Sequence, residues 1–356
     1  MITTFHGKKI TGMLAVLPET EYDYDVETAP FATLQTRRLK RIMGFGKRRA
    51  AKADTTTGDL CRYAMQYLLD QELIRTADVG AILVLGLTPD YFVPHNSNIL
   101  HGEFDFPKDV VCIDIPQGCC GFMVGLMQAC MLLDHMPGKK ALIFTGDVLN
   151  RKDPSVPLTE SSFGGDACTV TVVENDFSAP DIYYSIYADG KDREALIRHA
   201  GAYRMPSSPE TAIPRDTGEG NGVMKPYDAL WMNGSMIFNF MQREVPPLVD
   251  EITEYAGVTK DDIDRFFFHQ PNKFMLEKLA ERMKVPFEKI PMNIVGNFGN
   301  SSGSTIPVTI TFNCGQQLER ESVKCCLAGF GSGLAWSAAV MDLGKLRFCK
   351  SITSNL

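Results

Sequence analysis

The segment Asp114-Ile115-Pro116-Gln117-Gly118-Cys119-Cys120-Gly121-Phe122 connects an expected strand to an expected helix. The apolar residues 110–115 predict the strand, and Gly118 permits a sharp turn after it. From Cys119 to His135 a helical pattern follows, with apolar residues on every side of the helical wheel. Such a helix must be enclosed, and this one is too short and interrupted for a lipid bilayer. We therefore expect it to run through the middle of the molecule, between layers.

Outward from this segment, short apolar runs alternate with longer helical patterns, which is typical of an α/β protein. Strands are expected at 9–17, 79–85, 110–115, 141–145, 168–173, 265–268, 325–329 and 335–341, and further helices at 59–71, 235–255, 273–283 and 304–319. The segment 176–228 is rich in Pro, Gly, Asp and Ser, so we expect hairpins and the crossover between two halves there. A length of 356 residues also favours two units.

Composition excludes several classes of protein. Hydrophobic residues make up 44% and charged residues 22%, which is typical of a globular chain. The net charge of −7 gives no basic surplus for nucleic acid. There is no apolar run of the roughly 20 residues that cross a membrane, and the first residues lack the apolar core of a signal peptide. Ten cysteines without a CxxC pair favour reduced thiols over a metal site, so we expect a cytoplasmic protein.

Basic residues gather between Arg37 and Lys52. Eight of them lie there: Arg37, Arg38, Lys40, Arg41, Lys47, Arg48, Arg49 and Lys52. Such a run is most often a solvated face. The alternative is a docking surface for an anionic partner, such as a phosphate or an acidic carrier protein.

The turn at the start of the central helix is a candidate site for a nucleophile. A thiol there meets the positive end of the helix dipole and the free N–H groups of the first turn, which lower the pKa of a thiol. Its own N–H faces the place where an attacked carbonyl oxygen would gather charge. A small buried cysteine is the alternative interpretation, and nothing in the pattern chooses Cys119 over Cys120.

Three further segments carry polar groups to strand ends or turns. Phe266-Phe267-Phe268-His269-Gln270-Pro271-Asn272 places an imidazole after an aromatic strand. Asn297-Phe298-Gly299-Asn300-Ser301-Ser302-Gly303-Ser304 is a Gly- and Asn-rich loop before a helix, and Gly329-Phe330-Gly331-Ser332-Gly333 is a turn between apolar strands. For each segment taken alone, the structural interpretation is the more usual one: a structural histidine, a turn with a helix cap, and a close backbone approach.

In this order, the segments resemble the condensing enzymes of the thiolase superfamily, and most of all β-ketoacyl-acyl-carrier-protein synthase III. The likeness covers most of the chain, and it includes Ile10–Pro18, Thr145–Arg151, Phe163–Ala167 and Met232–Ser235. The resemblance implies a five-layered αβαβα fold of two similar halves, 1–176 and 177–356. It also implies a homodimer.

The resemblance assigns roles to residues. It implies that Cys119 accepts the acyl group, that His269 and Asn300 complete a catalytic triad, and that the backbone N–H groups of Cys119 and Ser332 form the oxyanion hole. The implied reaction is a decarboxylative Claisen condensation of acyl-CoA with malonyl-acyl carrier protein, with no metal or redox cofactor. Substrate-binding roles are implied for Arg151, Asn272 and Val93.

The chain departs from the family pattern at three places. No Trp lies between residues 30 and 50, where the family has one that stacks on the adenine of CoA, although Arg151 matches the arginine on its other side. Phe274 replaces a basic residue used for carrier docking. Val93, before Pro94, replaces a phenylalanine that reaches the partner subunit's acyl pocket, which suggests a wider pocket.

Three alternatives to condensation remain open from the sequence. The acyl group could pass from Cys119 to an alcohol or amine without carbon–carbon bond formation. The chain could be a non-catalytic partner subunit, although Cys119, His269 and Asn300 are all present. A thiol hydrolase using the same Cys and His is the third alternative.

Overall fold

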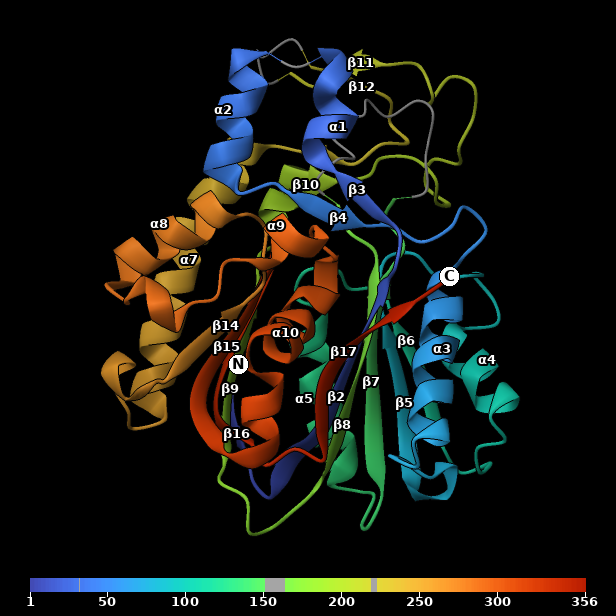
Figure 1. Cartoon of the computed structure of the whole chain (residues 1–356), viewed down its shortest axis with the longest axis vertical. Coiled ribbons are helices and arrows are strands. Elements are labelled where there is room, and N and C mark those ends of the chain that lie inside the picture. Colours follow the sequence, from blue (N-terminus) through green and yellow to red (C-terminus); the bar gives the residue numbers. More distant parts are fainter. Residues whose placement is uncertain (32, 151–163, 219–222) are drawn as a thin grey trace.

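Two β-sheets organise the computed structural model, which describes residues 1–31, 33–150, 164–218 and 223–356 (Figure 1). The six-stranded sheet has the order β17 (Phe348–Ser354), β2 (Lys8–Pro18), β8 (Ala167–Asn175), β7 (Lys140–Asp147), β5 (Val79–Leu85), β6 (Val111–Ile115). Strands β7, β5 and β6 run parallel, and β8 runs antiparallel to β7 and β2. Strand β6 therefore lies at the edge of this sheet.

The five-stranded sheet combines β1 with four strands of the second half of the chain. Its order is β1 (Ile2–Phe5), β9 (Ile182–Ala188), β16 (Ala335–Gly344), β15 (Ser322–Gly331), β14 (Arg265–Phe268). Only β14 and β15 are parallel in this sheet. Their parallel pairing brings the ends of both strands, with His269 and Ser332 just beyond them, to one edge of the sheet.

Helices fill the space between the sheets and cover both outer faces. Helices α5 (Gly121–Leu133) and α10 (Thr305–Arg320) lie between the sheets, α3 (Thr57–Asp70) and α4 (Asn96–Glu103) cover the six-stranded sheet, and α7 (Gly234–Tyr255) and α8 (Lys273–Met283) cover the other. Apolar side chains of both sheets pack on α5 in one buried cluster. The five-layered αβαβα arrangement expected from the sequence is confirmed.

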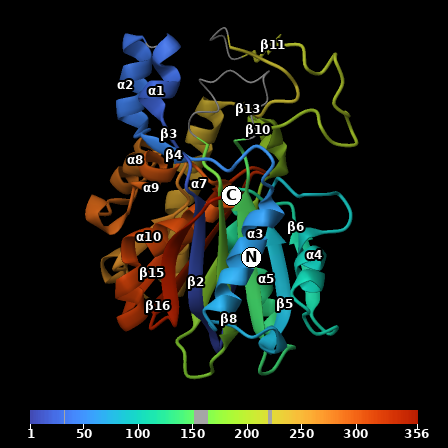
Figure 2. The same cartoon turned by 45° about the vertical axis from the view of Figure 1, so that its right-hand side comes forward.

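Smaller elements lie above the sheets (Figure 2). They are β3 (Glu21–Asp23), α1 (Tyr24–Thr28), α2 (Leu34–Met43), β4 (Lys47–Arg49), β10 (Leu196–Ile197), β11 (Arg215–Asp216), β12 (Met224–Lys225), β13 (Trp231–Met232) and α9 (Ile294–Phe298), with short 3-10 turns between elements. Among the described residues, no helix has the length and apolar character to span a membrane.

The terminal strands cross between the two halves expected from the sequence. Strand β1 joins the five-stranded sheet, and β17 joins the six-stranded sheet. We propose that the chain consists of two halves, residues 1–176 and 177–356, which exchange these terminal strands. Strand β9 lies in the segment for which the sequence favoured hairpins and a crossover, because Pro180-Asp181 and Asp189-Gly190 flank it.

Helix α5 differs from its expected form in two respects. It begins at Gly121, with Cys120 as its N-cap, so Cys119 lies in the preceding turn. One of its faces is also incompletely covered: Val124 and Met127 are half-buried, and Met131 is 47% exposed. The prediction of a helix enclosed on every side is wrong for this face, because the apolar pattern cannot say whether another part of the same chain covers it.

Candidate active site

Cys119 lies where three segments of the chain meet. The turn after β6 brings it beside the end of β15, and a Cβ added at Gly331 would lie 2.5 Å from Cys119 Cβ and 2.9 Å from its Sγ. Glycine at 331 therefore makes room for the thiol. A Cβ added at Gly118 would lie 3.0 Å from Ser302 Oγ, so the loop before α10 borders the same turn.

The structure separates the two adjacent cysteines. Cys120 is fully buried among the apolar side chains around α5, and its thiol donates to the backbone oxygen of Gly329 at 3.4 Å. Cys119 keeps partial exposure, and its thiol faces the backbone N–H of Ser332 and the hydroxyl of Ser302. Only Cys119 therefore presents its sulfur to this group of polar atoms.

The pKa of the Cys119 thiol is governed by burial. Burial and the negative charge of Asp147 raise it to about 11, and the N–H groups of Cys119 and Ser332 and the Ser302 hydroxyl oppose this shift. The expectation of a lowered pKa is wrong, because desolvation of the thiolate outweighs the N–H groups at the helix start. The same N–H groups still point at the sulfur and favour negative charge beside it.

His269 follows β14 directly and is buried. Its backbone N–H donates to the backbone oxygen of Ala328 at 2.8 Å, which extends the β14–β15 pairing by one residue to His269. Its Nδ1 lies 2.7 Å from Thr305 Oγ1 at the start of α10. Burial lowers the pKa of His269 to about 3, so the ring is neutral throughout the physiological range.

Asn300 lies in the loop between α9 and the 3-10 turn η6 (Ser302–Ser304). Its Oδ1 accepts from the backbone N–H of Ser302 at 2.9 Å, which fixes the orientation of the carboxamide. The Nδ2 group takes no part in that hydrogen bond and can donate elsewhere. The loop is also anchored through its backbone, because the Gly165 N–H donates to the backbone oxygen of Asn300 at 2.9 Å. A Cβ at Gly165 would lie 2.2 Å from the Phe298 oxygen, so this close approach requires glycine.

Ser302 connects the three predicted catalytic residues. Its N–H binds Asn300, its backbone oxygen raises the pKa of His269, and its hydroxyl lowers the pKa of Cys119. It has a φ of +55°, in the left-handed region, and its buried hydroxyl also opposes the rise in the pKa of Asp147. The sequence alone does not single out Ser302, because a serine in a Gly- and Ser-rich loop is most often a turn or cap residue.

Asp147, at the end of β7, is a second group that sequence reasoning missed. Its Oδ1 accepts from the N–H groups of Leu87 at 2.6 Å and Thr88 at 3.1 Å and from Thr88 Oγ1 at 3.0 Å. Burial nevertheless raises the pKa of Asp147 to about 6. The available signal was a carboxylate directly after an apolar strand, since such a group must be paired when it is buried.

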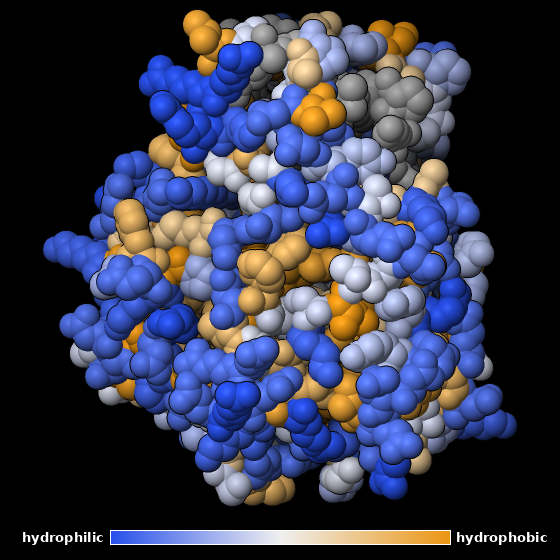
Figure 3. All heavy atoms as spheres, in the orientation of Figure 1, coloured by the Kyte–Doolittle hydropathy of each residue, from blue (hydrophilic) through white to orange (hydrophobic). Residues whose placement is uncertain are grey.

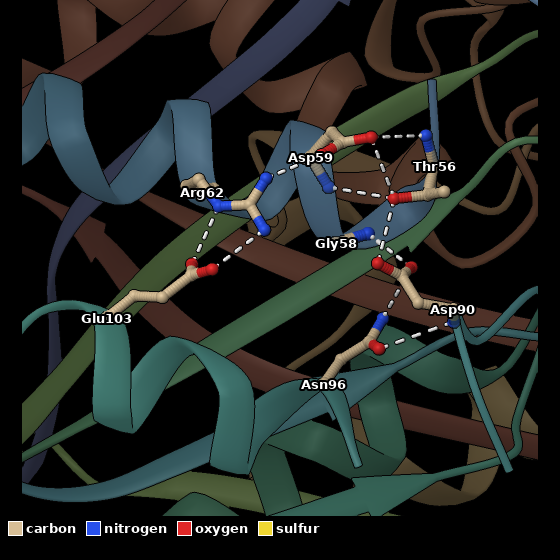
Figure 4. A network of polar contacts seen from close by, with 7 residues as sticks. All are labelled: Thr56, Gly58, Asp59, Arg62, Asp90, Asn96 and Glu103. Carbon is tan, nitrogen blue, oxygen red and sulfur yellow. Dashed lines mark hydrogen bonds and ion pairs between the residues drawn. The ribbon is translucent and has the colours of Figure 1, made fainter. Parts of the chain in front are cut away.

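A polar network holds the loop that passes from this site to the surface (Figure 4). The Asp90 carboxylate accepts from Gly58 N–H and Thr56 Oγ1, both at 2.8 Å, and from Asn96 Nδ2 at 3.2 Å. The loop is thereby tied to the start of α3, while Tyr91, Phe92 and Val93 remain more than 60% exposed beyond it, with Val93 at 79%. Beyond the network, Phe92 packs against Tyr203, with ring centroids 5.6 Å apart.

The remaining predicted residues have different placements. Asn272 caps α8, its Oδ1 accepting from Met275 N–H at 2.9 Å, so a substrate contact is left to its Nδ2. Arg151 lies outside the described residues. Ser332 follows β15 and directs its N–H at Cys119. No group of three or more His, Cys, Asp or Glu side chains suited to a metal ion occurs in the described ranges.

Part of the basic run is neutralised within the chain. Lys40 pairs with Asp25, Arg48 with Glu27 at 2.5 Å, and Lys47 and Arg49 with Glu21 at 2.6 and 3.2 Å. Arg37, Arg38 and Arg41 on α2 are exposed and form no ion pair with the acidic side chains that the structure describes. In Figure 3 strongly hydrophilic side chains gather over this helix.

Comparison with known proteins agrees with this fold. Residues 253–343 match the model of the 3-oxoacyl-[acyl-carrier-protein] synthase III C-terminal family. A putative 3-oxoacyl-[acyl-carrier-protein] synthase 3 of Campylobacter jejuni is 28% identical over 97% of both chains. A β-ketoacyl-[acyl-carrier-protein] synthase III of Clostridium beijerinckii is 28% identical over 94% of this chain and 98% of its own length.

A solved structure extends the similarity to the whole chain. The crystal structure of a 3-oxoacyl-(acyl-carrier protein) synthase from Burkholderia xenovorans superposes with a TM-score of 0.90 and 32% identity, covering 99% of each chain. With its five layers and its Cys, His and Asn at adjoining strand and helix ends, the chain belongs to the 3-oxoacyl-acyl-carrier-protein synthase III family.

Proposed function

We propose that this enzyme condenses an acyl thioester with malonyl-acyl carrier protein, releasing carbon dioxide and passing through an acyl-Cys119 intermediate. The observation that supports this most strongly is the arrangement around Ser302, which contacts Asn300 directly and influences the pKa values of Cys119 and His269. A nucleophile and two neutral hydrogen-bonding side chains are therefore assembled around one loop.

In the first half-reaction, Cys119 attacks the thioester of acyl-CoA and the CoA thiol leaves. Because burial raises the pKa of Cys119 to about 11, the thiol is mostly protonated at neutral pH. The charge that develops on the carbonyl oxygen is stabilised by the N–H groups of Cys119 and Ser332. One such donor is commonly worth about 10²–10³ in rate.

In the second half-reaction, the malonyl thioester loses carbon dioxide and its carbanion attacks acyl-Cys119. The developing enolate oxygen needs hydrogen-bond donors that keep their protons during the step. Neutral His269 and the Nδ2 group of Asn300 serve as these donors, and the Ser302 N–H holds Asn300 in the required orientation. The condensation itself requires neither metal nor redox cofactor.

Substrate recognition involves three of the predicted positions. Val93, smaller than the family's phenylalanine, widens the acyl pocket, and Asn272 and Arg151 contact the thioester's carrier. Phe274, which is uncharged, stacks on Phe238 with ring centroids 5.7 Å apart. It therefore offers a carrier protein no basic group. We place acyl carrier protein docking on the exposed face of α2 formed by Arg37, Arg38 and Arg41, because acyl carrier protein is acidic.

A homodimer is supported by the uncovered edge of the six-stranded sheet. Val111 and Ile113 of β6 are only half-buried, and they border the same apolar cluster as the half-buried Val124 and Met127 of α5. An unpaired strand with apolar neighbours requires a cover, and a second copy of the chain provides a matching strand. All ten cysteines are free, which supports a reducing compartment such as the cytoplasm.

Two variants test the condensation. His269→Ala and Asn300→Ala are expected to take up one acyl group from acyl-CoA yet to release no carbon dioxide from malonyl-acyl carrier protein. His101→Ala, a partly buried histidine whose Nε2 lies 3.0 Å from the Pro107 oxygen, is the matched control and is expected to keep both activities.

Product masses distinguish condensation from the second candidate, acyl transfer to an alcohol or amine. The missing tryptophan and the uncharged Phe274 favour that candidate. A 3-oxo product with carbon dioxide supports condensation, whereas an ester or amide without carbon dioxide contradicts it.

A further inference from the structure

Residues 91–95 form a loop whose two ends are joined by hydrogen bonds. The backbone N–H of Asp90 donates to Asn96 Oδ1 at 3.3 Å, and Asn96 Nδ2 donates to Asp90 Oδ1 at 3.2 Å. We call this reciprocal pair of Asp90 and Asn96 the neck of the loop (Figure 4). Because the pair joins the residues on either side of the loop, it holds the loop closed whatever the tip contacts.

Two secondary-structure elements anchor the neck. The N–H of Gly58, in the first turn of α3, donates to Asp90 Oδ1 at 2.8 Å. On the other side, the backbone N–H groups of Asn96 and Ser97 donate to the Asp114 carboxylate of β6 at 2.8 and 2.9 Å. A Cβ added at Gly58 would lie 2.2 Å from Asp90 Oδ2, so the close approach of this carboxylate to α3 requires glycine.

The segment that leads into the neck starts beside the nucleophile. Gly86 N–H donates to the backbone oxygen of Ile115 at 3.3 Å, where the turn that carries Cys119 begins. A Cβ added at Gly118 would lie 2.8 Å from Leu87 Cδ1, so the same segment borders that turn. The chain therefore runs within a few residues from the acylation site to the neck.

Beyond the neck, the loop has little packing of its own. Tyr91, Phe92 and Val93 are largely exposed, and the ring contact of Phe92 with Tyr203 lies at the loop's tip. A segment with few buried contacts opens easily unless its hydrogen bonds hold it. The position of these three side chains therefore depends on the neck.

We propose that Asp90 is a positioning residue that fixes the loop 91–95 through the neck and thereby sets the acyl chain length that loads on Cys119. This inference rests on the proposed function, in which Val93 contributes to the acyl pocket. A wall that holds its position distinguishes neighbouring chain lengths, since one methylene in a fitted pocket is worth about 10-fold or more in rate. A wall that yields loses this discrimination.

Two substitutions open the neck from different sides. Asp90→Ala removes the acceptor of the Gly58 and Asn96 hydrogen bonds. Gly58→Ala leaves the loop sequence unchanged and drives the carboxylate away, because its Cβ would lie 2.2 Å from Asp90 Oδ2. Gly102→Ala on α4 is the matched control, since nothing lies within 4 Å of the added Cβ.

Asp90→Asn is the conservative variant that should keep the neck. Its amide oxygen can accept from Gly58 N–H and Asn96 Nδ2 as the carboxylate does. Its amide nitrogen can donate to the Thr56 hydroxyl, which lies 2.8 Å from Asp90 Oδ2. Loss of charge alone is therefore separated from loss of the hydrogen bonds.

The readout is the rate of Cys119 loading across a panel of straight-chain acyl-CoA thioesters of increasing length. In Asp90→Ala and Gly58→Ala, the ratio of rates between neighbouring chain lengths should fall about 10-fold. Asp90→Asn and Gly102→Ala should keep the wild-type ratio. Alkylation of Cys119 by iodoacetamide, a reagent too small to need the loop, should keep its wild-type rate in all four variants. A ratio of rates does not depend on the fraction of folded enzyme, so general destabilisation does not imitate this result.

Hydrogen exchange measures the neck itself. The backbone amides of residues 91–93 should exchange faster in Asp90→Ala and Gly58→Ala than in wild type, and at the wild-type rate in Asp90→Asn. If Asp90→Ala does not fold, Asn96→Ala opens the same neck from its other side.

Wild-type selectivity in a folded variant with an opened neck would overturn the proposal. An equal loss of loading at every chain length would also overturn it, as would selectivity in Asp90→Asn that matches Asp90→Ala. Failure of wild type to load any thioester would instead contradict the proposed function. In that case, unchanged exchange at residues 91–93 in Asp90→Ala would still overturn the role of the neck.

Discussion

Replacing Gly331 by alanine tests the placement of the Cys119 thiol. The new Cβ would lie 2.5 Å from Cys119 Cβ and 2.9 Å from Sγ, whereas ordinary carbon contacts begin at about 3.5 Å. The turn that carries Cys119 must therefore move by about 1 Å, or the end of β15 must move with Ser332. Overpacking of this kind costs about 1–3 kcal/mol of folding free energy, and a displacement of about 1 Å at a reacting atom costs about 10²-fold in rate.

The assay measures, by intact-protein mass spectrometry, the initial rate at which acyl-CoA adds one acyl group to Cys119. A thermal denaturation curve of the same variant measures its stability. Gly121→Ala is the matched control in the same turn, because its Cβ would meet its nearest atoms at 3.7 and 3.9 Å. We expect Gly121→Ala to load normally, and its melting temperature to be at least that of wild type, since alanine favours a helix over glycine by about 1 kcal/mol. Loading of Gly331→Ala at the wild-type rate, with an unchanged melting temperature, would refute the packing argument.

Four further outcomes follow from the same structure. Asp147→Asn removes the charge that raises the Cys119 pKa, so iodoacetamide should alkylate Cys119 faster at pH 8 than in wild type; Asp166→Asn, another buried carboxylate, should leave that rate unchanged. The pKa of His269 is about 3 in the folded protein and 6.5 in the free side chain, so the unfolded state binds the extra proton between these values. The free energy of unfolding therefore falls as the pH drops through this window. At pH 4.5, urea unfolding should show that wild type has lost about 3 kcal/mol more than His269→Asn. Ile113→Lys puts a charge on the edge strand and is expected to convert a dimer to monomer in light scattering, whereas an unchanged mass would contradict pairing through β6. Arg37→Glu/Arg38→Glu/Arg41→Glu should raise the KM for malonyl-acyl carrier protein without changing acyl-CoA loading, and an unchanged KM would remove α2 from the docking surface.

Much of the architecture could be predicted from periodicity. The strands Val79–Leu85 and Arg265–Phe268 and the helix Lys273–Met283 have the bounds expected from the sequence. These elements are long or strongly apolar, and their side-chain pattern is set locally. Strand β9 and the exchange of β1 and β17 between sheets depend on pairing with residues more than 150 positions away, which no local pattern records.

The candidate site was predicted only in outline. A cysteine in a strand-to-helix turn is visible in the sequence, and the N–H groups beside its sulfur follow from that position. Its raised pKa is not visible, because it depends on burial and on Asp147 from another strand. The hydrogen-bonding roles of Ser302 and Thr305 also depend on which way a hydroxyl points in the folded protein, so a Gly- and Ser-rich loop could indicate only a turn.

The most direct test of the account is intact-protein mass after incubation with a panel of acyl-CoA thioesters. Wild type and Cys120→Ala should each gain a single acyl mass, and Cys119→Ala should gain none, because only the thiol of Cys119 faces the N–H of Ser332 while Cys120 is packed among apolar side chains. An acyl adduct on Cys119→Ala, or none on the wild type with any thioester of the panel, would contradict the assignment of Cys119 as the acyl-accepting nucleophile.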